Sequence, residues 1–334
     1  MSGERPDGAR TAPMLVGRAD LLSLALRRWA SAVAGTGTLL LVAGEAGIGK
    51  TRLLGEFATR VAPEARVLRA TAYPRDAEAA GSLLLDLADE LTRLGRARQG
   101  SALRSRLLED RAAGSGAGSD RRLLVGDLGA LLRDLLDEEP TLLRIEDLHW
   151  VDELSLDVLD RLAVSLPGMP AMVVASYRSD ELYPRTPLAQ WRARLLGQRL
   201  AEEVHPPRLG REETAVLAEA LTGSLPSTAF LDALQSHSDG IPLHIEELIA
   251  AGSPAALPDT VAEAVRTRSA LLHAETQSVA AAASVVGRSF PSNCSRRSPK
   301  CRRIRSRTRS RSSCSTTSSP APTRGVRVPP RPHL

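Results

Sequence analysis

The sequence predicts an α/β fold in which a parallel sheet, with helices on both faces, is followed by a smaller α-helical domain. Two observations predict the sheet: short apolar runs of the kind expected of buried parallel strands, and helical apolar patterns that alternate with them along the chain. A third observation predicts the second domain, because from about residue 211 the strand-like runs stop and only helical patterns remain.

The predicted α/β domain covers residues 14–208 and follows a leader, residues 1–13, whose Gly, Pro and charged residues predict disorder. The strands are expected at residues 38–43, 65–72, 141–145 and 171–176, and the helices at residues 20–34, 52–61, 81–94, 123–136 and 155–165. A Gly-, Ser- and Ala-rich stretch at residues 111–120 predicts a flexible loop.

The predicted helical domain covers residues 209–256, with helices expected at residues 212–222, 228–236 and 245–251. A further helix is expected at residues 259–286, within a region that runs from residue 257 to 290. The remaining residues, 291–334, form a segment rich in Ser, Arg and Pro, which we call the tail and predict to be disordered.

The net charge of +5 comes entirely from the tail. The tail holds 12 of the 44 Lys and Arg and none of the 39 Asp and Glu, which leaves 32 bases against 39 acids, or −7, in residues 1–290. We therefore expect no direct DNA binding from residues 1–290, because they offer no basic footprint.

Cysteine usage and hydropathy indicate the compartment. All three cysteines lie in the tail, so residues 1–290 can form no disulfide and no Cys-based metal site. No apolar run approaches the roughly 18 residues of a membrane span, and the first residues do not resemble a secretion signal. We expect a cytoplasmic protein without a membrane partner.

A phosphate-binding motif follows the first predicted strand. The pattern G-x-x-x-x-G-K-[ST] is met at every fixed position by Gly44-Glu45-Ala46-Gly47-Ile48-Gly49-Lys50-Thr51, with Arg52 next in the helix. Its glycines let backbone N–H groups point at phosphate oxygens, Lys50 would neutralise the β- and γ-phosphates, and Thr51 would ligate Mg²⁺. The alternative is a Gly-rich turn with an incidental lysine, but Lys50 is the only lysine in residues 1–290 and the strand-loop-helix order fits a P-loop NTPase.

Two carboxylates follow the third predicted strand, where the second half of such a site is expected. Glu146 would hold the hydration shell of Mg²⁺, and Asp147 would polarise the attacking water. The alternative is a solvated strand end, where acidic residues are common. Arg144 lies within the strand, and its charge would be costly to bury unless it pairs with an acidic group or lies at the edge of the helices that cover the sheet.

The run Glu146-Asp147-Leu148-His149-Trp150-Val151-Asp152 resembles the signature of the AAA-related signal-transduction ATPases, the STAND class, found in large LuxR-type regulators. Other segments, in the same order as in that family, resemble its motifs: Leu15-Val16-Gly17-Arg18, Tyr177-Arg178-Ser179-Asp180, Gly240-Ile241-Pro242-Leu243 and Leu257-Pro258-Asp259-Thr260. The usual acidic residue four positions after Gly17 is replaced by Leu21.

The resemblance implies roles for several residues. Val16, Gly17 and Arg18 would contact the adenine, Pro242 would pack on the base, and Arg178 would approach the γ-phosphate as a sensor. Arg178 as an ordinary surface arginine is the alternative. His149 and Trp150 are interpreted as a packed turn without a chemical role, and Asp152 as a cap for the helix near Ser155.

The resemblance therefore implies a nucleotide switch that binds ATP or ADP with Mg²⁺, hydrolyses ATP slowly, and could self-associate through its ATPase module. It resembles the N-terminal part of a LuxR-family transcriptional regulator without its DNA-binding domain. One alternative is the ATPase module of a cyclase- or kinase-linked signalling protein, and another is a nucleic-acid-binding protein that acts through its basic tail.

The tail has two interpretations. It is either a disordered Arg/Ser-rich segment or the product of a frameshift after Phe290. Plausible GC-rich codons for residues 291–300, read from each third base, encode an amphipathic helix of the kind that the family places there. We prefer the frameshift hypothesis, under which the chain is truncated and residues 257–290 are, as the resemblance implies, the start of a truncated winged-helix region.

Overall fold

The computed structural model describes residues 14–74, 79–112 and 118–251, together with Ala274 and Gln277. The chain divides into two compact units, residues 1–258 and 259–334, and every element named below belongs to the first. The predicted leader, almost all of the region 257–290 and the whole tail lie outside the described residues.

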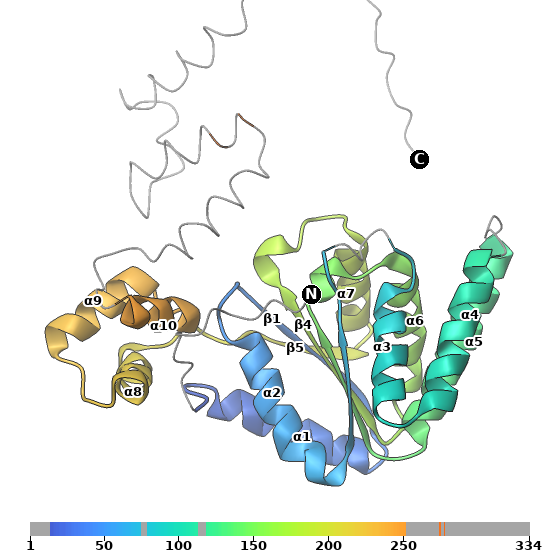
Figure 1. Cartoon of the computed structure of the whole chain (residues 1–334), viewed down its shortest axis with the longest axis horizontal. Coiled ribbons are helices and arrows are strands. Elements are labelled where there is room, and N and C mark those ends of the chain that lie inside the picture. The colour runs from blue at the N-terminus through green and yellow to red at the C-terminus, as the bar shows by residue number, and fades with distance from the viewer. Residues whose placement is uncertain (1–13, 75–78, 113–117, 252–273, 275–276, 278–334) are drawn as a thin grey trace, which may run out of the picture. The chain divides into compact units, whose positions relative to one another are not determined.

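A five-stranded parallel sheet forms the centre of the first unit (Figure 1). The strands are β1 (Thr38–Gly44), β2 (Arg66–Thr71), β3 (Thr141–Glu146), β4 (Ala171–Arg178) and β5 (Ala201–Val204), in the order β2-β3-β4-β1-β5. The α/β prediction and the first four strands are thereby confirmed. The edge strand β5 was not predicted, because it has only four residues and two of them are Glu.

Helices cover both faces of the sheet. They are α1 (Ala19–Val33), α2 (Lys50–Val61), α3 (Ser82–Arg93), α4 (Ala97–Ala112), α5 (Gly118–Asp137), α6 (Glu153–Ser165) and α7 (Pro187–Gly197), with the short 3₁₀ turns η1 (Ala62–Glu64), η2 (Leu148–Trp150) and η3 (Ser179–Glu181). Alternate residues of β1 face opposite sides, so Leu40 and Val42 pack with α1 and α2, whereas Leu39 and Leu41 pack with α3, α5 and α6.

Two parts of this helical cover differ from the sequence prediction. The helices α4 and α7 were not predicted, and the expected flexible loop at residues 111–120 is wrong at both ends. There α4 continues to Ala112 and α5 begins at Gly118, while residues 113–117 lie outside the described residues. Some of the small residues that suggested a loop therefore occur inside helices.

Asp152 caps α6, as predicted. Its carboxylate accepts hydrogen bonds from the Ser155 N–H at 2.9 Å and the Ser155 hydroxyl at 2.6 Å. It also accepts one from the Gly81 N–H at 2.7 Å, directly before α3. This one buried carboxylate therefore joins the N-termini of two helices.

The helical prediction for the end of the unit is also confirmed. The three helices are α8 (Arg211–Thr222), α9 (Thr228–Ser238) and α10 (Pro242–Ala250). They pack on each other through small apolar clusters that contain Leu217, Leu221, Leu234, Ile245 and Leu248. Helix α10 begins at Pro242, three residues earlier than predicted, because proline fits the first turn of a helix, where its missing N–H is not needed.

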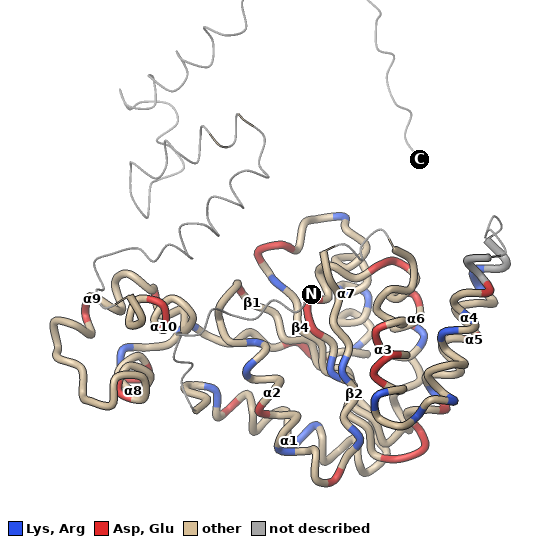
Figure 2. Tube along the Cα trace, in the orientation of Figure 1, with Lys and Arg blue, Asp and Glu red and all other residues tan. Residues whose placement is uncertain are grey.

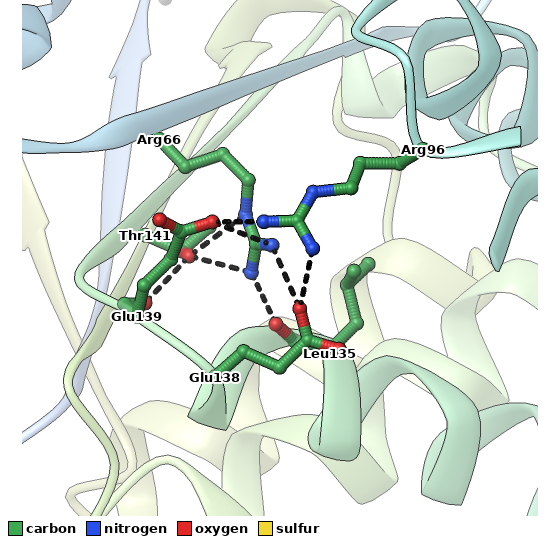
Figure 3. A network of polar contacts seen from close by, with 6 residues as sticks. All are labelled: Arg66, Arg96, Leu135, Glu138, Glu139 and Thr141. Carbon is green, nitrogen blue, oxygen red and sulfur yellow. Dashed lines mark hydrogen bonds and ion pairs between the residues drawn. The ribbon is translucent and has the colours of Figure 1, made fainter.

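A network of ion pairs and hydrogen bonds lies at the amino ends of β2 and β3 (Figure 3). The buried Arg66 side chain donates to the Thr141 hydroxyl at 2.9 and 3.1 Å, and lies 3.0 Å from Glu139 and 3.3 Å from Glu138. Arg96 pairs with the same two carboxylates, at 2.9 Å from Glu138 and 2.5 Å from Glu139. We call these five residues the amino-edge network.

Acidic and basic residues both occur in the α/β part and in α8–α10, and neither sign gathers on one of these parts (Figure 2). Among the described residues, no helix combines the length and the apolar composition needed to cross a membrane.

Candidate functional site: the P-loop cleft

The predicted phosphate-binding motif forms the turn between β1 and α2, at the carboxyl edge of the sheet (Figure 1). Two of its glycines have left-handed backbones, with φ of 78° at Gly47 and 97° at Gly49. A Cβ atom on Gly47 would lie only 2.8 Å from the Leu243 side chain of α10. The loop therefore needs glycine at Gly47 both for its curvature and for its close contact with the helical part.

The N-terminus of α2 faces this loop. The first hydrogen bond along the helix runs from the Leu53 N–H to the Gly49 carbonyl at 3.0 Å, so the N–H groups of Lys50 and Thr51 have no acceptor within the helix. No side chain caps the helix at Gly49. With the positive end of the helix dipole, these N–H groups make a suitable binding site for phosphate.

Lys50 places a buried cation in the same loop. Its side chain nitrogen donates to the backbone carbonyls of Gly44 and Glu45, at 2.8 and 2.9 Å. Burial lowers the pKa of Lys50, and the nearby Arg178 lowers it further, while Asp147 opposes the shift. A phosphate beside this ammonium group would supply the negative charge that favours its protonated form.

Arg178 and Asp147 approach the loop from the neighbouring strands. In the parallel register of β1 and β4, Gly44 lies opposite Arg178, so the sensor candidate ends its strand beside the P-loop. The Arg178 guanidinium is 2.7 Å from the Glu181 carboxylate. Asp147 follows β3 with a left-handed backbone, φ 58°, and its carboxylate lines the same cleft. The sheet thus brings three predicted residues together from separate strands and loops.

Glu146, by contrast, is not among the residues that line the cleft and forms an ion pair with Arg144. Arg144 also donates to the Thr51 carbonyl at 3.1 Å. The guanidinium lies beside Gly55 of α2, where a Cβ would be in ordinary contact with it at 3.6 Å. Pairing therefore offsets only part of the predicted cost of burying Arg144, because its Nε makes no hydrogen bond within the described residues. Strand periodicity could have indicated this pair, because residues two apart share a face.

His149 and Trp150 form the packed turn that was predicted. The His149 side chain is only 2% exposed, and its ring centroid lies 5.0 Å from that of Trp150. Its Nε2 is 3.3 Å from the Glu181 carboxylate and its Nδ1 is 3.9 Å from Asp147, but neither nitrogen makes a hydrogen bond within the described residues. Burial lowers the pKa of His149, against the opposing effect of the two carboxylates.

The cleft beside the P-loop has a volume of about 550 Å³ and combines a charged end with an apolar one. Of the predicted residues, it is lined by Val16, Arg18, Ala46, Gly47, Ile48, Gly49, Lys50, Thr51, Arg52, Asp147, Arg178 and Pro242. Gly17, Gly44, Glu45 and Glu146 are adjacent and do not line it. Arg18 is buried, which lowers its pKa, and donates to the carbonyls of Gly17 at 2.8 Å and Ile48 at 3.2 Å.

The helical part supplies four further lining residues: Leu209 and Leu217, which the sequence did not indicate, and Leu243 and Glu246, which lie in the segment that resembles the family's helical-domain motif. It also holds the P-loop directly. The Leu243 N–H donates to the Gly47 carbonyl at 3.2 Å, and the Arg208 guanidinium meets both Glu45 oxygens at 2.8 Å. These contacts join segments about 160 to 200 residues apart in the chain, so no local pattern could have predicted them.

The cleft fits a nucleotide better than it fits a free metal ion. Met14, Leu15, Leu209 and Leu217 give an apolar end suited to a base, and Lys50 with the α2 N-terminus gives a phosphate end. For Mg²⁺, the Thr51 hydroxyl and the Asp147 carboxylate offer the oxygen ligands that this ion prefers, whereas Glu146 is engaged by Arg144.

Comparisons with known proteins agree with this geometry. Residues 14–174 match the family model described as an AAA ATPase domain, and this range includes the P-loop and both carboxylates. Residues 14–174 are therefore similar to an AAA ATPase domain. An uncharacterised protein of Rhizobium meliloti is 27% identical over 286 residues, with 74% of this chain and 26% of the relative covered. The chain spans about a quarter of that relative's length.

Solved structures with a similar arrangement come from several proteins. A signal transduction ATPase with numerous domains (STAND) that carries a tetratricopeptide repeat sensor, from Pyrococcus horikoshii, has a TM-score of 0.46 at 20% identity, covering 82% of this chain and 35% of its own. Cdc6p from Pyrobaculum aerophilum has a TM-score of 0.45 at 15% identity, covering 73% and 62%. Domain III of the replication initiation protein DnaA from Thermotoga maritima has a TM-score of 0.38 at 14% identity, covering 71% and 82%.

Proposed function

We propose that the chain is a nucleotide switch, which binds ATP or ADP with Mg²⁺ in the P-loop cleft and hydrolyses ATP slowly. The observation that carries the proposal is the buried Lys50, which lies beside the open N-terminus of α2 in a cleft of nucleotide size. The similarity of residues 14–174 to an AAA ATPase domain supports nucleotide binding.

Each residue of the proposed site has a distinct task. Lys50 neutralises the β- and γ-phosphates, and Arg178 approaches the γ-phosphate from β4. Thr51 and Glu146, the latter in its ion pair with Arg144, would hold the Mg²⁺ ion, which would supply charge neutralisation at the phosphates, while Asp147 would polarise the attacking water. At the other end Val16, Gly17, Arg18 and Pro242 surround the base.

The contacts between the P-loop and α8–α10 support the switch itself. Leu243 of the helical part holds the Gly47 carbonyl, and Arg208 joins the Glu45 carboxylate to Asp239 of that part. A change of nucleotide at the P-loop would therefore alter these contacts. Slow ATP hydrolysis would then switch the contact between the P-loop and α8–α10 from one state to another, and its purpose would not be to make product. Self-association through the ATPase domain stays a prediction.

We further propose that the switch belongs to a LuxR-type transcriptional regulator. The order of its motifs supports this, from Val16 through the P-loop and Glu146–Asp152 to Pro242. The frameshift after Phe290 is part of the proposal, supported by the loss of all acidic residues in the tail. Resequencing the gene and reading it past this codon tests both: an intact frame without a helix-turn-helix sequence would overturn them.

The nucleotide site is tested by replacing its lysine. A Lys50→Ala variant of the full chain should bind ATP at least about a hundredfold more weakly in calorimetry, because the phosphates lose their buried counter-ion. Its unfolding midpoint should stay near that of the parent. Arg60→Ala is the matched control, since it removes a cation from the same helix, where Arg60 pairs with Glu56 at 3.0 Å. Equal ATP affinity in the Lys50 variant and the parent would refute the proposed phosphate site.

A further inference from the structure

We infer that Arg144 is a built-in counter-ion of the metal half-site, which lets the cleft bind nucleotide with little dependence on Mg²⁺. The inference rests on the proposed function and deepens it, because it concerns how the same site balances charge. It starts from one observation: the arginine contacts both residues to which the Mg²⁺ ion is assigned.

The geometry of this contact is specific. Arg144 lies in β3, and its side chain is only 9% exposed, with that of Glu146 at 17%. One guanidinium nitrogen forms the ion pair with Glu146 and donates to the Thr51 carbonyl at 3.1 Å. The guanidinium therefore lies between the strand end and the first turn of α2, where positive charge acts on both elements.

The pair changes the charge that a nucleotide meets. A free carboxylate near the phosphates repels a metal-free nucleotide and attracts a hydrated Mg²⁺ ion, so it makes binding depend on the ion. When Arg144 neutralises Glu146, both effects are reduced. The affinity for metal-free nucleotide then approaches the affinity for the Mg²⁺ complex.

Arg144 is not explained by the stability of the fold. Its neighbours Leu143 and Ile145 are apolar, and its register partner on β4 is Val174. Its Nε makes no hydrogen bond within the described residues, so burying this side chain remains costly even with the ion pair. An apolar residue of similar volume would generally serve a strand interior as well or better. The pair thus has its clearest consequence in the electrostatics of the cleft.

The test compares ATP and ADP affinities, measured by calorimetry in excess Mg²⁺ and in EDTA, for the full chain and its Arg144→Met variant. For the parent, the affinity for each nucleotide in EDTA should be within about threefold of its affinity in Mg²⁺. For the variant, in which the charge of Glu146 has no counter-ion, the affinity in EDTA should be more than about tenfold weaker than in Mg²⁺. The same Mg²⁺ dependence in both proteins would overturn the inference, as would a parent that loses more than about tenfold in EDTA.

Further variants keep the test decisive. An Arg144→Met/Glu146→Gln double variant removes both charges, so it avoids a lone buried charge and should retain the parent's low Mg²⁺ dependence. A strong dependence in that variant would overturn the inference even if the single variant does not fold. Arg66→Met is the matched control, because it removes a buried, ion-paired arginine of the neighbouring strand at the opposite edge. If the parent binds nucleotide in neither condition, the proposed function itself is refuted. If the ratio of the affinities in Mg²⁺ and in EDTA is the same in the parent and in the Arg144→Met variant, only the role of Arg144 is refuted.

Discussion

Strand β2 holds the buried Arg66 at the amino edge of the sheet, and strand β3 holds the buried Arg144 toward the carboxyl edge. The two guanidinium groups differ in how many of their hydrogen bonds are made. At the amino edge, Arg66 meets the Thr141 hydroxyl, two carboxylates and the Leu135 carbonyl (Figure 3). At the carboxyl edge, Arg144 meets one carboxylate and one carbonyl, and its Nε has no partner within the described residues.

The same contrast extends to other residues of the carboxyl edge. Both ring nitrogens of His149 lack hydrogen bonds in the described part of the chain, and the Lys50 ammonium is held by two backbone carbonyls. Polar groups that are buried and incompletely satisfied cost stability, and they tend to occur where a ligand or a reaction uses them. We therefore predict that charges at the amino edge stabilise the fold, while those at the carboxyl edge serve the proposed nucleotide binding.

The largest effect expected from this comparison is at the amino edge. Arg66→Met should lower the free energy of unfolding by about 2–3 kcal/mol, because several hydrogen bonds to a charged group are lost at once. ATP affinity should stay within about twofold of the parent's. Urea denaturation and calorimetry measure the two quantities. A variant with normal stability and weakened ATP binding would break the proposed division between the edges.

A smaller effect is expected from acid at the carboxyl edge. Burial lowers the pKa of His149 below its unfolded value, although Asp147 and Glu181 oppose this and Arg178 and Lys50 add to it. The unfolded state therefore takes up a proton first, so stability is full above about pH 6.5 and falls as the pH drops, by at most about 1.4 kcal/mol per unit for one proton.

A His149→Gln variant isolates this titration from that of other groups. The parent should lose more free energy of unfolding than the variant when the pH is lowered from about 7 to about 5.5. Urea denaturation at the two pH values gives the difference. A steeper loss in the variant would mean that the two carboxylates, and not burial, control the ring.

The smallest effect is expected at the surface, where Arg208 bridges Glu45 and the helical part. These side chains are 42% and 43% exposed, so Arg208→Ala should cost less than about 1 kcal/mol of stability. Nucleotide release in stopped flow should be about two- to fivefold faster at low salt, and the difference should shrink as salt is added. Arg211→Ala is the control, because Arg211 pairs at 2.6 Å with Asp232 inside the helical part. Equal acceleration by both variants would exclude a specific role for Arg208.

The sequence predicted those features that are encoded locally. Strands β1 and β4 were predicted because each is mainly an apolar run, β2 and β3 because apolar residues surround their arginines, and the P-loop because its residues are consecutive. Helix α4 was missed because its buried Leu103 and Leu107 are separated by arginines and small residues, which leave no clear apolar stripe. Helix α7 did carry a signal, with Thr186 as its cap and Pro187 in its first turn.

The rest of the site depends on side-chain directions that a linear pattern does not fix. Leu209, Leu217 and Leu243 have the periodicity of ordinary core residues, and only the fold shows that they line the cleft. Arg208 looks like any surface arginine until Glu45 is found beside it. Local motifs therefore located the phosphate end, while the remaining walls required the tertiary structure.

The hydrogen bond between Leu243 and Gly47 has a consequence for time as well as for affinity. Since the side chain of Leu243 lies against the α-carbon of Gly47, the loop that would cradle a phosphate and the first turn of α10 share one contact surface. A bound nucleotide could then leave only as often as these two peptides separate. We expect the occupied protein to behave as a timer, whose interval depends on the lifetime of a main-chain contact as well as on the charges that hold the phosphates.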